Sequence, residues 1–562
     1  MSRFSKALLV VGGVVVALAI VVYVNRVELM LSAIEVMADR QTPVSPNRPV
    51  VWDSGRDPAG APSSERPPNV VLILADDLGW NDITLGGGGV AGGTVPTPHI
   101  DSIAKEGVAF TQGYAANGTC APSRAAIMSG RYGTRFGFEF TPTPDAMMPA
   151  LRTIISAAGG ARSQVRPPMV VDEEAEAIPY EQMGMPPSEI TLAELLKERG
   201  YHTAHIGKWH LGREGGMSPH EQGFDESLLM ASGLYLKKDD PGVVNAKQDF
   251  DPIDLFLWRA LKFAASFNGG DAFEPARYLT DYYTDEAVKA IEANRDRPFF
   301  LYLAHWAPHT PLQAAKEDYD ALSHIELHRE RVYAAMIRSL DRGVGRVLDA
   351  LRTHGLEENT LVLFTSDNGG AAYIGLPHVN DPFRGWKITL FEGGVHVPFL
   401  AKWPAKIAPG RTYEAPVHHF DLYATAAAAA GAPLPSDRKM DGVDLVPYVR
   451  GETAGVPHEM LFWRSGAAQS VRRGRWKLNV SDPPGRDDRR EWLFDLESDP
   501  GERRDLSAEQ PAVLAALRAA LDTHNAEQAE PRWPSQMSTP INLDRAEHEP
   551  DQPGDEFAYW SN

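Results

Sequence analysis

This sequence is poor in cysteine and in net positive charge. Cys120 is the one cysteine among 562 residues. A single thiol excludes an intrachain disulfide framework, a four-cysteine zinc site and an iron–sulfur cluster. The 55 basic residues stand against 75 acidic ones, which gives a formal charge of −20. We therefore expect no nucleic-acid partner, because such a partner needs a basic face.

The rest of the composition is that of a folded protein. Apolar residues make up 43% of the chain and charged residues 23%, which argues against disorder over most of the length. A chain of this length can bury a large core and is expected to form roughly two to four domains.

The N-terminus carries the one long apolar run, residues 7–24. Its length is close to the roughly 20 residues that a membrane-spanning helix needs. Arg3 and Lys6 precede it, so the chain that follows is expected on the periplasmic or extracellular side, anchored to the membrane. A cleaved signal peptide, giving a secreted protein, is the alternative. Residues 21–26 lack a small-x-small cleavage site, which favours the anchor.

Changes in composition along the chain predict five regions. A flexible linker rich in Pro, Ser, Gly and Asp follows the anchor, and a polar tail follows the last expected helix. The expected regions are an anchor or signal peptide (1–26), a linker (27–67), a catalytic α/β domain (68–400), a smaller C-terminal α+β subdomain (401–530) and a polar tail (531–562).

Short apolar runs, typical of buried parallel strands, alternate with segments of helical periodicity. The runs are 69–75, 201–206, 298–304 and 360–366. This alternation predicts an α/β fold with a large, mostly parallel or mixed sheet flanked by helices. Closely spaced short runs between residues 461 and 495, and a helical segment at 511–524, predict a smaller C-terminal antiparallel sheet plus helix.

Polar side chains follow the ends of these runs, where ligands bind in open α/β sheets. One set offers only oxygen: Asp76, Asp77, Asp367 and Asn368. Packed carboxylates repel one another, and a hard divalent cation removes that cost. The set therefore predicts a metal site, for which Ca²⁺ fits and Mg²⁺ or Mn²⁺ stays open.

A second set of polar side chains is basic: Arg124, Lys208, His210, His309 and Lys387. On a chain of charge −20, a cluster of cations in one cleft suits an anionic substrate that the overall field would otherwise repel.

Cys120 precedes Pro122, a residue that favours a first helical turn. A thiol at a helix N-terminus is expected to have a lowered pKa and to be reactive; a small buried hydrophobe is the alternative.

The stretch from Cys120 to Gly130 reads CAPSRAAIMSG, which fits the pattern C-x-P-S-R-x-x-[LI]-x-[TS]-G. This motif, with the blocks GKWHLG, APHTPL and SDNGG, resembles the formylglycine-dependent sulfatases of the alkaline phosphatase superfamily. The resemblance covers roughly residues 68–506. It implies that superfamily's fold and an arylsulfatase-like sulfuric ester hydrolase. The segment at about 140–187 departs from the family and is expected to shape the substrate cleft.

The resemblance also implies roles. A separate formylglycine-generating enzyme would oxidise Cys120 to an aldehyde, whose hydrate supplies the nucleophile. The implied metal ligands are Asp76, Asp77, Cys120, Asp367 and Asn368. The implied catalytic residues are Cys120; Arg124, which holds the hydrate; Lys208 and Lys387, which bind the sulfate; His309, near the leaving group; and His210.

Two other functions remain open on these residues. A phosphonate monoester or phosphodiester hydrolase would use the same scaffold, because both substrates are tetrahedral anions. An anchored binding homologue without activity is the second alternative. The expected substrate is a sulfate ester of a small molecule or of a carbohydrate. The membrane, through the N-terminal helix, is a further expected partner.

Overall fold

The computed structural model describes residues 3–56, 66–158 and 165–562. A nine-stranded sheet forms the centre of the body, in the order β13-β2-β12-β11-β1-β9-β5-β6-β8. Four neighbouring strands coincide with the predicted runs: β11 (Thr360–Ser366), β1 (Asn69–Ala75), β9 (Phe299–Ala304) and β5 (His202–Gly207). These four run parallel. The expected large α/β sheet is confirmed.

The remaining strands make the sheet mixed. On one side, β12 (Phe399–Lys402) runs antiparallel to β11 and to β2 (Val108–Phe110), and β13 (Arg411–Tyr413) is parallel to β2. On the other side, β6 (Glu226–Gly233) is parallel to β5 and antiparallel to β8 (Phe263–Phe267). Since β13 is part of this sheet, the main body extends past residue 400, where the sequence suggested a boundary.

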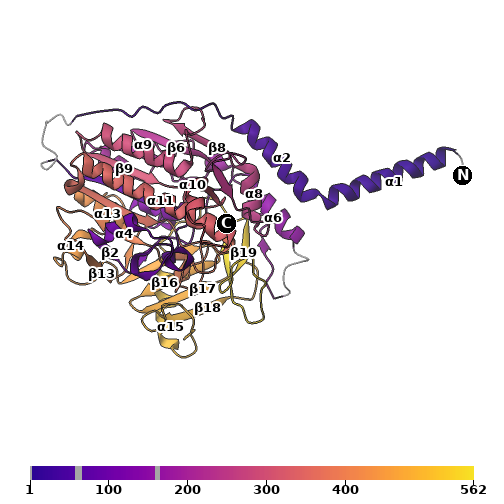
Figure 1. Ribbon diagram of the computed structural model, residues 1–562. Coiled ribbons are helices and arrows are strands. Elements are labelled where there is room, and N and C mark those ends of the chain that lie inside the picture. Colours follow the sequence, from indigo (N-terminus) through magenta and orange to yellow (C-terminus); the bar gives the residue numbers. More distant parts are fainter. Residues whose placement is uncertain (1–2, 57–65, 159–164) are drawn as a thin grey trace.

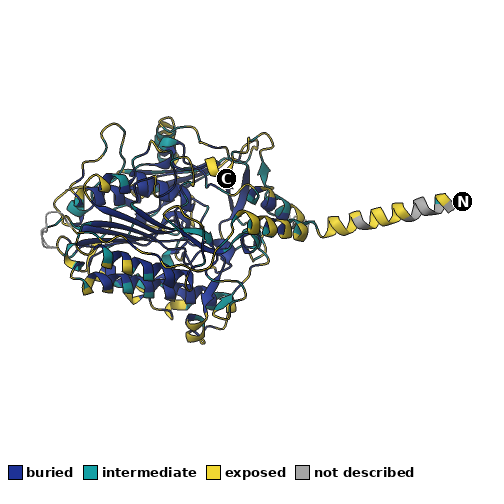
Figure 2. Cartoon of the chain, turned by 90° about the horizontal axis from the view of Figure 1, so that it is seen from above, coloured by how far each residue is buried: buried dark blue, intermediate teal, exposed yellow. Residues whose placement is uncertain are grey.

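Helices bury both faces of the sheet. Alternate side chains of β1 point to opposite faces, so Val71 and Ile73 join one apolar cluster while Val70, Leu72 and Leu74 join another. On the first face lie α4 (Pro98–Lys105), α9 (Leu279–Ala293) and α11 (His328–Thr353). On the second lie α5 (Cys120–Ser129), α7 (Leu192–Lys197) and α13 (Phe420–Ala429). Figure 2 shows the buried sheet between these layers.

The smaller C-terminal sheet is antiparallel, as expected, and α15 (Pro511–Asn525) packs on it. Its strands are β15 (Met460–Ser465), β16 (Ala468–Arg473), β17 (Trp476–Ser481) and β18 (Arg490–Asp495). Two short pairs, β3 (Gly113–Tyr114) with β14 (Val417–His418) and β7 (Val243–Asn245) with β10 (Gln313–Ala315), complete the connections.

The region expected as a polar tail contains two buried strands, β19 (Met537–Asn542) and β20 (Phe557–Ser561). They form a three-stranded sheet with β4 (Val170–Val171), which belongs to the segment that departs from the family. Trp386 donates a hydrogen bond from Nε1 to the carbonyl oxygen of Asn542 (3.2 Å). The end of the chain is therefore packed against the body. The prediction of an extended tail is wrong because it rests on the polar composition of residues 531–562 alone.

Part of the expected linker is helical. After α1 (Arg3–Val24), α2 (Arg26–Gln41) packs on α6 (Met147–Ala158) and α8 (Pro252–Ala260). Its apolar residues recur at helical spacing, which gives it a face to bury. Residues 57–65 of the expected linker lie outside the described residues. Within the described part of the chain, no single helix has the length and hydropathy of a membrane span; the bent pair Val11–Val24 and Arg26–Gln41 has both when taken together.

Candidate active site

The carboxylates expected to hold a metal meet because β1 and β11 are neighbours. The register pairs Ala75 with Ser366, so the residues that follow each strand lie side by side. The backbone N–H of Asp77 donates to Asp367 Oδ1 (3.2 Å), and Asn368 Nδ2 donates to Asp77 Oδ1 (2.9 Å). All of these side chains are buried.

The same residues fit a divalent cation. Carboxylate oxygens of Asp76, Asp77 and Asp367 all lie within 4.8 Å of one another. Asp76 Oδ1 and Asn368 Oδ1 are buried and have no hydrogen-bond partner. Burial, together with the neighbouring Asp367, raises the pKa of Asp76 to about 7. Unsatisfied oxygens at crowded carboxylates are what a hard cation stabilises.

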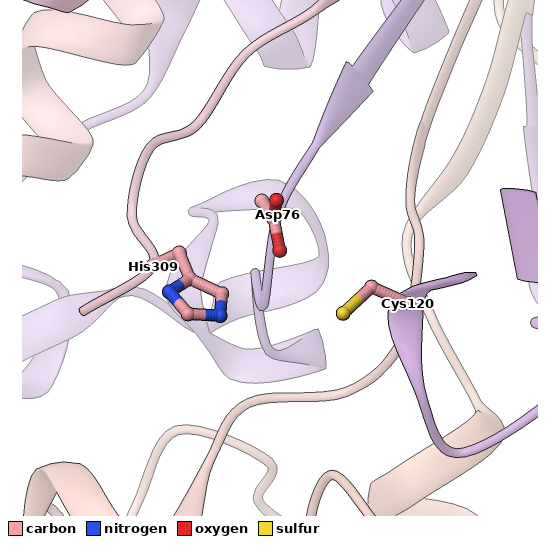
Figure 3. A group of neighbouring side chains, drawn as sticks. All are labelled: Asp76, Cys120 and His309. Carbon is pink, nitrogen blue, oxygen red and sulfur yellow. The ribbon is translucent and has the colours of Figure 1, made fainter. Parts of the chain in front are cut away.

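Cys120 is the first residue of α5 and is only 4% exposed. Its Sγ, an oxygen of Asp76 and a nitrogen of His309 lie within 4.8 Å of one another, and Figure 3 shows the three side chains pointing toward a common space. The expected lowering of the thiol pKa is wrong. Burial raises the pKa of Cys120, and Lys208 and Lys387 oppose this only in part. The helix N-terminus is outweighed because the thiolate would be removed from water.

Three cations face the three carboxylates. The guanidinium of Arg124 is fully buried, and its Nη2 lies 3.0 Å from Asp76 Oδ2 and 2.8 Å from Asp367 Oδ2. Lys208 Nζ lies 2.7 Å from Asp76 Oδ2 and Lys387 Nζ lies 2.7 Å from Asp77 Oδ1, and both lysines are buried as well. Three positive and three negative groups balance when all are ionised. A divalent cation added to this set would leave the site positive and suited to an anion.

The two histidines of the site are held neutral. His309 Nδ1 donates to the carbonyl oxygen of Thr310 (2.6 Å), which leaves Nε2 facing Lys387 Nζ at 3.1 Å. Burial and the charge of Lys387 keep the pKa of His309 well below its ordinary value. His210 contacts the carbonyl oxygen of Pro142 through Nε2 (3.3 Å), and its Nδ1 is buried without a partner. Burial and then Lys208 lower the pKa of His210 strongly.

Three aromatic residues that the sequence analysis missed support these groups. Trp306 stacks on His309 with ring centroids 3.8 Å apart, and Lys208 Nζ lies 4.6 Å from the centroid of its ring. Tyr373 donates to Asp77 Oδ2 (3.1 Å). Tyr235 donates to the backbone oxygens of Trp306 and His309. Trp306 lies three residues before His309, and of the three aromatic residues it is the one whose position in the sequence could have indicated a role in the site.

The backbone is strained where it carries the site. Asp77, His210 and Ile388 have positive φ angles of 63°, 64° and 69°, a backbone conformation that residues other than glycine rarely adopt. Ile388 follows Lys387 directly, and its N–H donates to the carbonyl oxygen of Gly118 (2.6 Å). This bond fastens the segment of Lys387 to the segment that leads into Cys120. Such strain persists only where surrounding contacts fix it.

A buried ionic cluster fastens the smaller sheet to the same segment. Lys477 of β17 is fully buried, and its Nζ lies 2.8 Å from Glu392 Oε1 and 3.2 Å from Glu502 Oε1. Glu392 is the first residue of the short helix α12 (Glu392–Val395). The backbone N–H of Glu392 donates a hydrogen bond to Glu502 Oε2 (2.6 Å). The N–H of Gly369, which follows Asn368, donates to the carbonyl oxygen of Gly394 in α12.

Comparison with known proteins agrees with this geometry. A sulfatase family model matches residues 68–432. Mouse steryl-sulfatase is 34% identical over 570 residues, covering 84% of each chain, and mouse N-acetylgalactosamine-6-sulfatase is 34% identical, covering 75% of this chain and 73% of its own. The chain belongs to the formylglycine-dependent sulfatase family, with an alkaline phosphatase-like fold. It is a sulfuric ester hydrolase, and its family implies a divalent metal and a formylglycine.

Solved structures show the same fold. The crystal structure of Ps i-CgsB is 30% identical and superimposes with a TM-score of 0.67, covering 83% of this chain and 95% of that one. Phosphonate monoester hydrolase SpPMH from Silicibacter pomeroyi is 19% identical with a TM-score of 0.56, covering 82% of this chain and 96% of that one, a likeness of fold alone.

Proposed function

We propose that this sulfatase acts through a formylglycine made from Cys120, beside a Ca²⁺ ion held by Asp76, Asp77, Asp367 and Asn368. The observation that carries the proposal is the burial of Cys120 Sγ within 4.8 Å of Asp76 and His309. An unmodified thiol in that position is a poor nucleophile, because burial raises its pKa. The modified residue and the ion together supply a nucleophilic hydroxyl at neutral pH.

The side chains around residue 120 divide the remaining work. Arg124 holds the hydrated residue, and its contacts with Asp76 and Asp367 fix its position. Lys208 and Lys387 bind the nonbridging oxygens of the sulfate and stabilise the charge that grows on them. His309 accepts a proton at Nε2 from Lys387 and passes it to the departing alcohol oxygen, because its own proton is held on Nδ1 by the carbonyl oxygen of Thr310. His210 is neutral with a free Nδ1, and it accepts the proton released when sulfate leaves.

The substrate class is proposed from the relatives. Steryl-sulfatase is named for a steryl ester and N-acetylgalactosamine-6-sulfatase for a sugar, so a sulfate ester of a small molecule or of a carbohydrate is proposed here. Hydrolysis of phosphonate monoesters is the second candidate, because SpPMH shares the fold. An inactive binding homologue is disfavoured by the complete set of ion-paired cations.

A sulfate-release screen on purified protein tests the proposal. Aryl and carbohydrate sulfates are compared with an aryl phosphonate monoester, and the mass of the Cys120 peptide is taken from the same preparation. Conversion to formylglycine removes one sulfur and two hydrogens and adds one oxygen. The variant Cys120→Ser, made in a host that oxidises cysteine in this motif, should keep the metal site and lose turnover. Multiple turnover by Cys120→Ser, or faster release from the phosphonate, would refute the proposal.

The maturation and location of the chain are part of the proposal. A formylglycine-generating enzyme is the required partner for Cys120. The uncharged run 7–24, preceded by basic residues, supports export with the catalytic domain on the periplasmic or extracellular side and α1 retained as a membrane anchor. Extraction of cell membranes with carbonate tests this. An anchored chain stays in the pellet and keeps its N-terminus, whereas a secreted chain is soluble and shortened.

A further inference from the structure

Helix α2 has one apolar face that packs on the body. Leu31 and Ile34 are 2% and 8% exposed, and they contact a cluster contributed by α6 and α8. The members of that cluster on the two helices are Ala150, Ile154, Phe256 and Leu257. Because successive residues are turned by about 100° around a helix axis, only one side of α2 is used by these contacts.

An acidic flank beside that face fixes α2 to the body by ion pairs. Glu35 lies 3.0 Å from both Lys238 Nζ and Arg259 Nη1. Glu28 pairs with Arg259 and Asp39 with Lys262. Charged groups with partners on the body would not enter the hydrocarbon of a bilayer, where each charge is costly. These pairs place α2 outside the membrane interior.

The side of α2 that faces away from the body is also apolar. Leu29, Val36 and Met37 occupy positions i, i+7 and i+8, and they are 51%, 49% and 50% exposed. Arg26 and Arg40 lie on the same side, one at each end of the helix. Leu29, Val36, Met37 and the two arginines together form the outer stripe of α2. An apolar stripe with basic ends has the composition of a helix that lies in a membrane interface.

Continuity with α1 indicates what covers this stripe. The axes of α1 and α2 differ by 71°, with the break at Asn25. Val15 and Ile20 of α1 are each 58% exposed, and Figure 2 shows α1 extending away from the body. The 22 residues of α1 span about 33 Å, against ~30 Å of bilayer hydrocarbon. If α1 crosses the bilayer, α2 turns to run nearly along its surface. In Figure 1 the body lies on one side of α2 and α1 leaves on the other.

We propose that α2 lies in the interface of a phospholipid bilayer, with Leu29, Val36 and Met37 among the upper acyl chains. Arg26 and Arg40 then reach the phosphate groups, a contact that anionic lipids strengthen. The opposite side of α2 holds the sulfatase body about one helix diameter, roughly 10 Å, from the surface. The inference rests on the proposed anchor and goes beyond it, because the body is fixed in orientation and does not swing on a linker.

Depth-dependent fluorescence quenching tests this on the full-length protein in vesicles of phosphatidylcholine and phosphatidylglycerol. Leu29→Cys and Val36→Cys are labelled one at a time with bimane. Val456→Cys is the matched control, an apolar side chain of similar exposure (46%) in the C-terminal half. The unsubstituted protein, whose one cysteine is buried, gives the background labelling. Doxyl-labelled lipid should quench the two α2 labels severalfold more than the control label, and aqueous iodide should do the reverse.

The failures are distinguishable. In one failure, the protein is membrane-bound but iodide quenches the α2 labels as strongly as the Val456 label. This result would refute the lipid contact of α2 and leave the proposed anchor unaffected. Protein that carbonate releases overturns the anchor itself. Excimer emission from pyrene at Val36 in two copies would mean that a second chain covers the stripe, which also overturns the proposal. Sulfate release by each variant reports separately on the sulfatase activity, since none of these positions lies in the active site.

Discussion

Replacing Lys477 by Met tests whether the buried ionic cluster holds the smaller sheet to the segment beside the active site. Lys477 is completely buried, and it is the partner of both Glu392 and Glu502. Removing one member of a buried ion pair leaves uncompensated charge and costs about 3–5 kcal/mol. Methionine keeps most of the volume, so the loss would come from charge and not from a cavity.

Urea unfolding, followed by tryptophan fluorescence, measures the loss. The control is Arg475→Met, which removes a more exposed cation paired with Asp495 and should destabilise the protein far less, because water screens an exposed pair. Burial raises the pKa of Glu502 to about 7 even with Lys477 present. Protonation therefore relieves the unpaired charge in acid, and the penalty of Lys477→Met should be smaller at pH 5.5 than at pH 8. Equal losses in the two variants, or a penalty that grows in acid, would refute the reasoning.

Three further predictions concern the site and its surroundings. Lys387→Ala should lower kcat by about 10²–10³, as loss of a preorganised oxyanion donor does, with sulfate release as the measurement. Asp82, whose pKa burial raises to about 7, stabilises the fold below about pH 4 and progressively less as the pH rises through 7. Asp82→Asn should therefore flatten the dependence of the thermal midpoint between pH 4 and pH 7. Removal of divalent cations by a chelator should abolish sulfate release and lower the thermal midpoint, and added Ca²⁺ should restore both.

The centre of the fold could be predicted because its strands are buried on both faces. Such strands read as continuous apolar runs, and the bounds of β1 and β11 match the predicted runs. The polar residues after them follow directly, since the carboxyl ends of neighbouring parallel strands meet at one edge. Short strands such as β12, inside the sheet, and β13, at its edge, carry no comparable run, and their pairing depends on residues far away in the sequence.

The remaining differences have tertiary causes. The pKa of Cys120 depends on how completely other segments cover it, which no local pattern reports. The last strands, β19 and β20, lie in a stretch that is polar overall, and what packs against them comes from far away in the sequence. Trp386 donates a hydrogen bond to the last residue of β19, Asn542, and Arg384 pairs with Asp544 just after it. Helix α2 has two apolar sides, one packed on the body and one exposed. Its charged residues lower the average hydropathy of the segment, so a hydropathy plot does not reveal either side.

The neighbouring positions of β1 and β11 give a bound ion a mechanical role. Their carboxylates lie on segments 290 residues apart in the chain, so a cation held by both acts as a reversible cross-link across the middle of the molecule. Opening the sheet between these strands requires release of the ion, and by mass action the free cation concentration then sets how often that opening occurs. Depletion of the metal would shorten the lifetime of the folded enzyme as well as stop its chemistry.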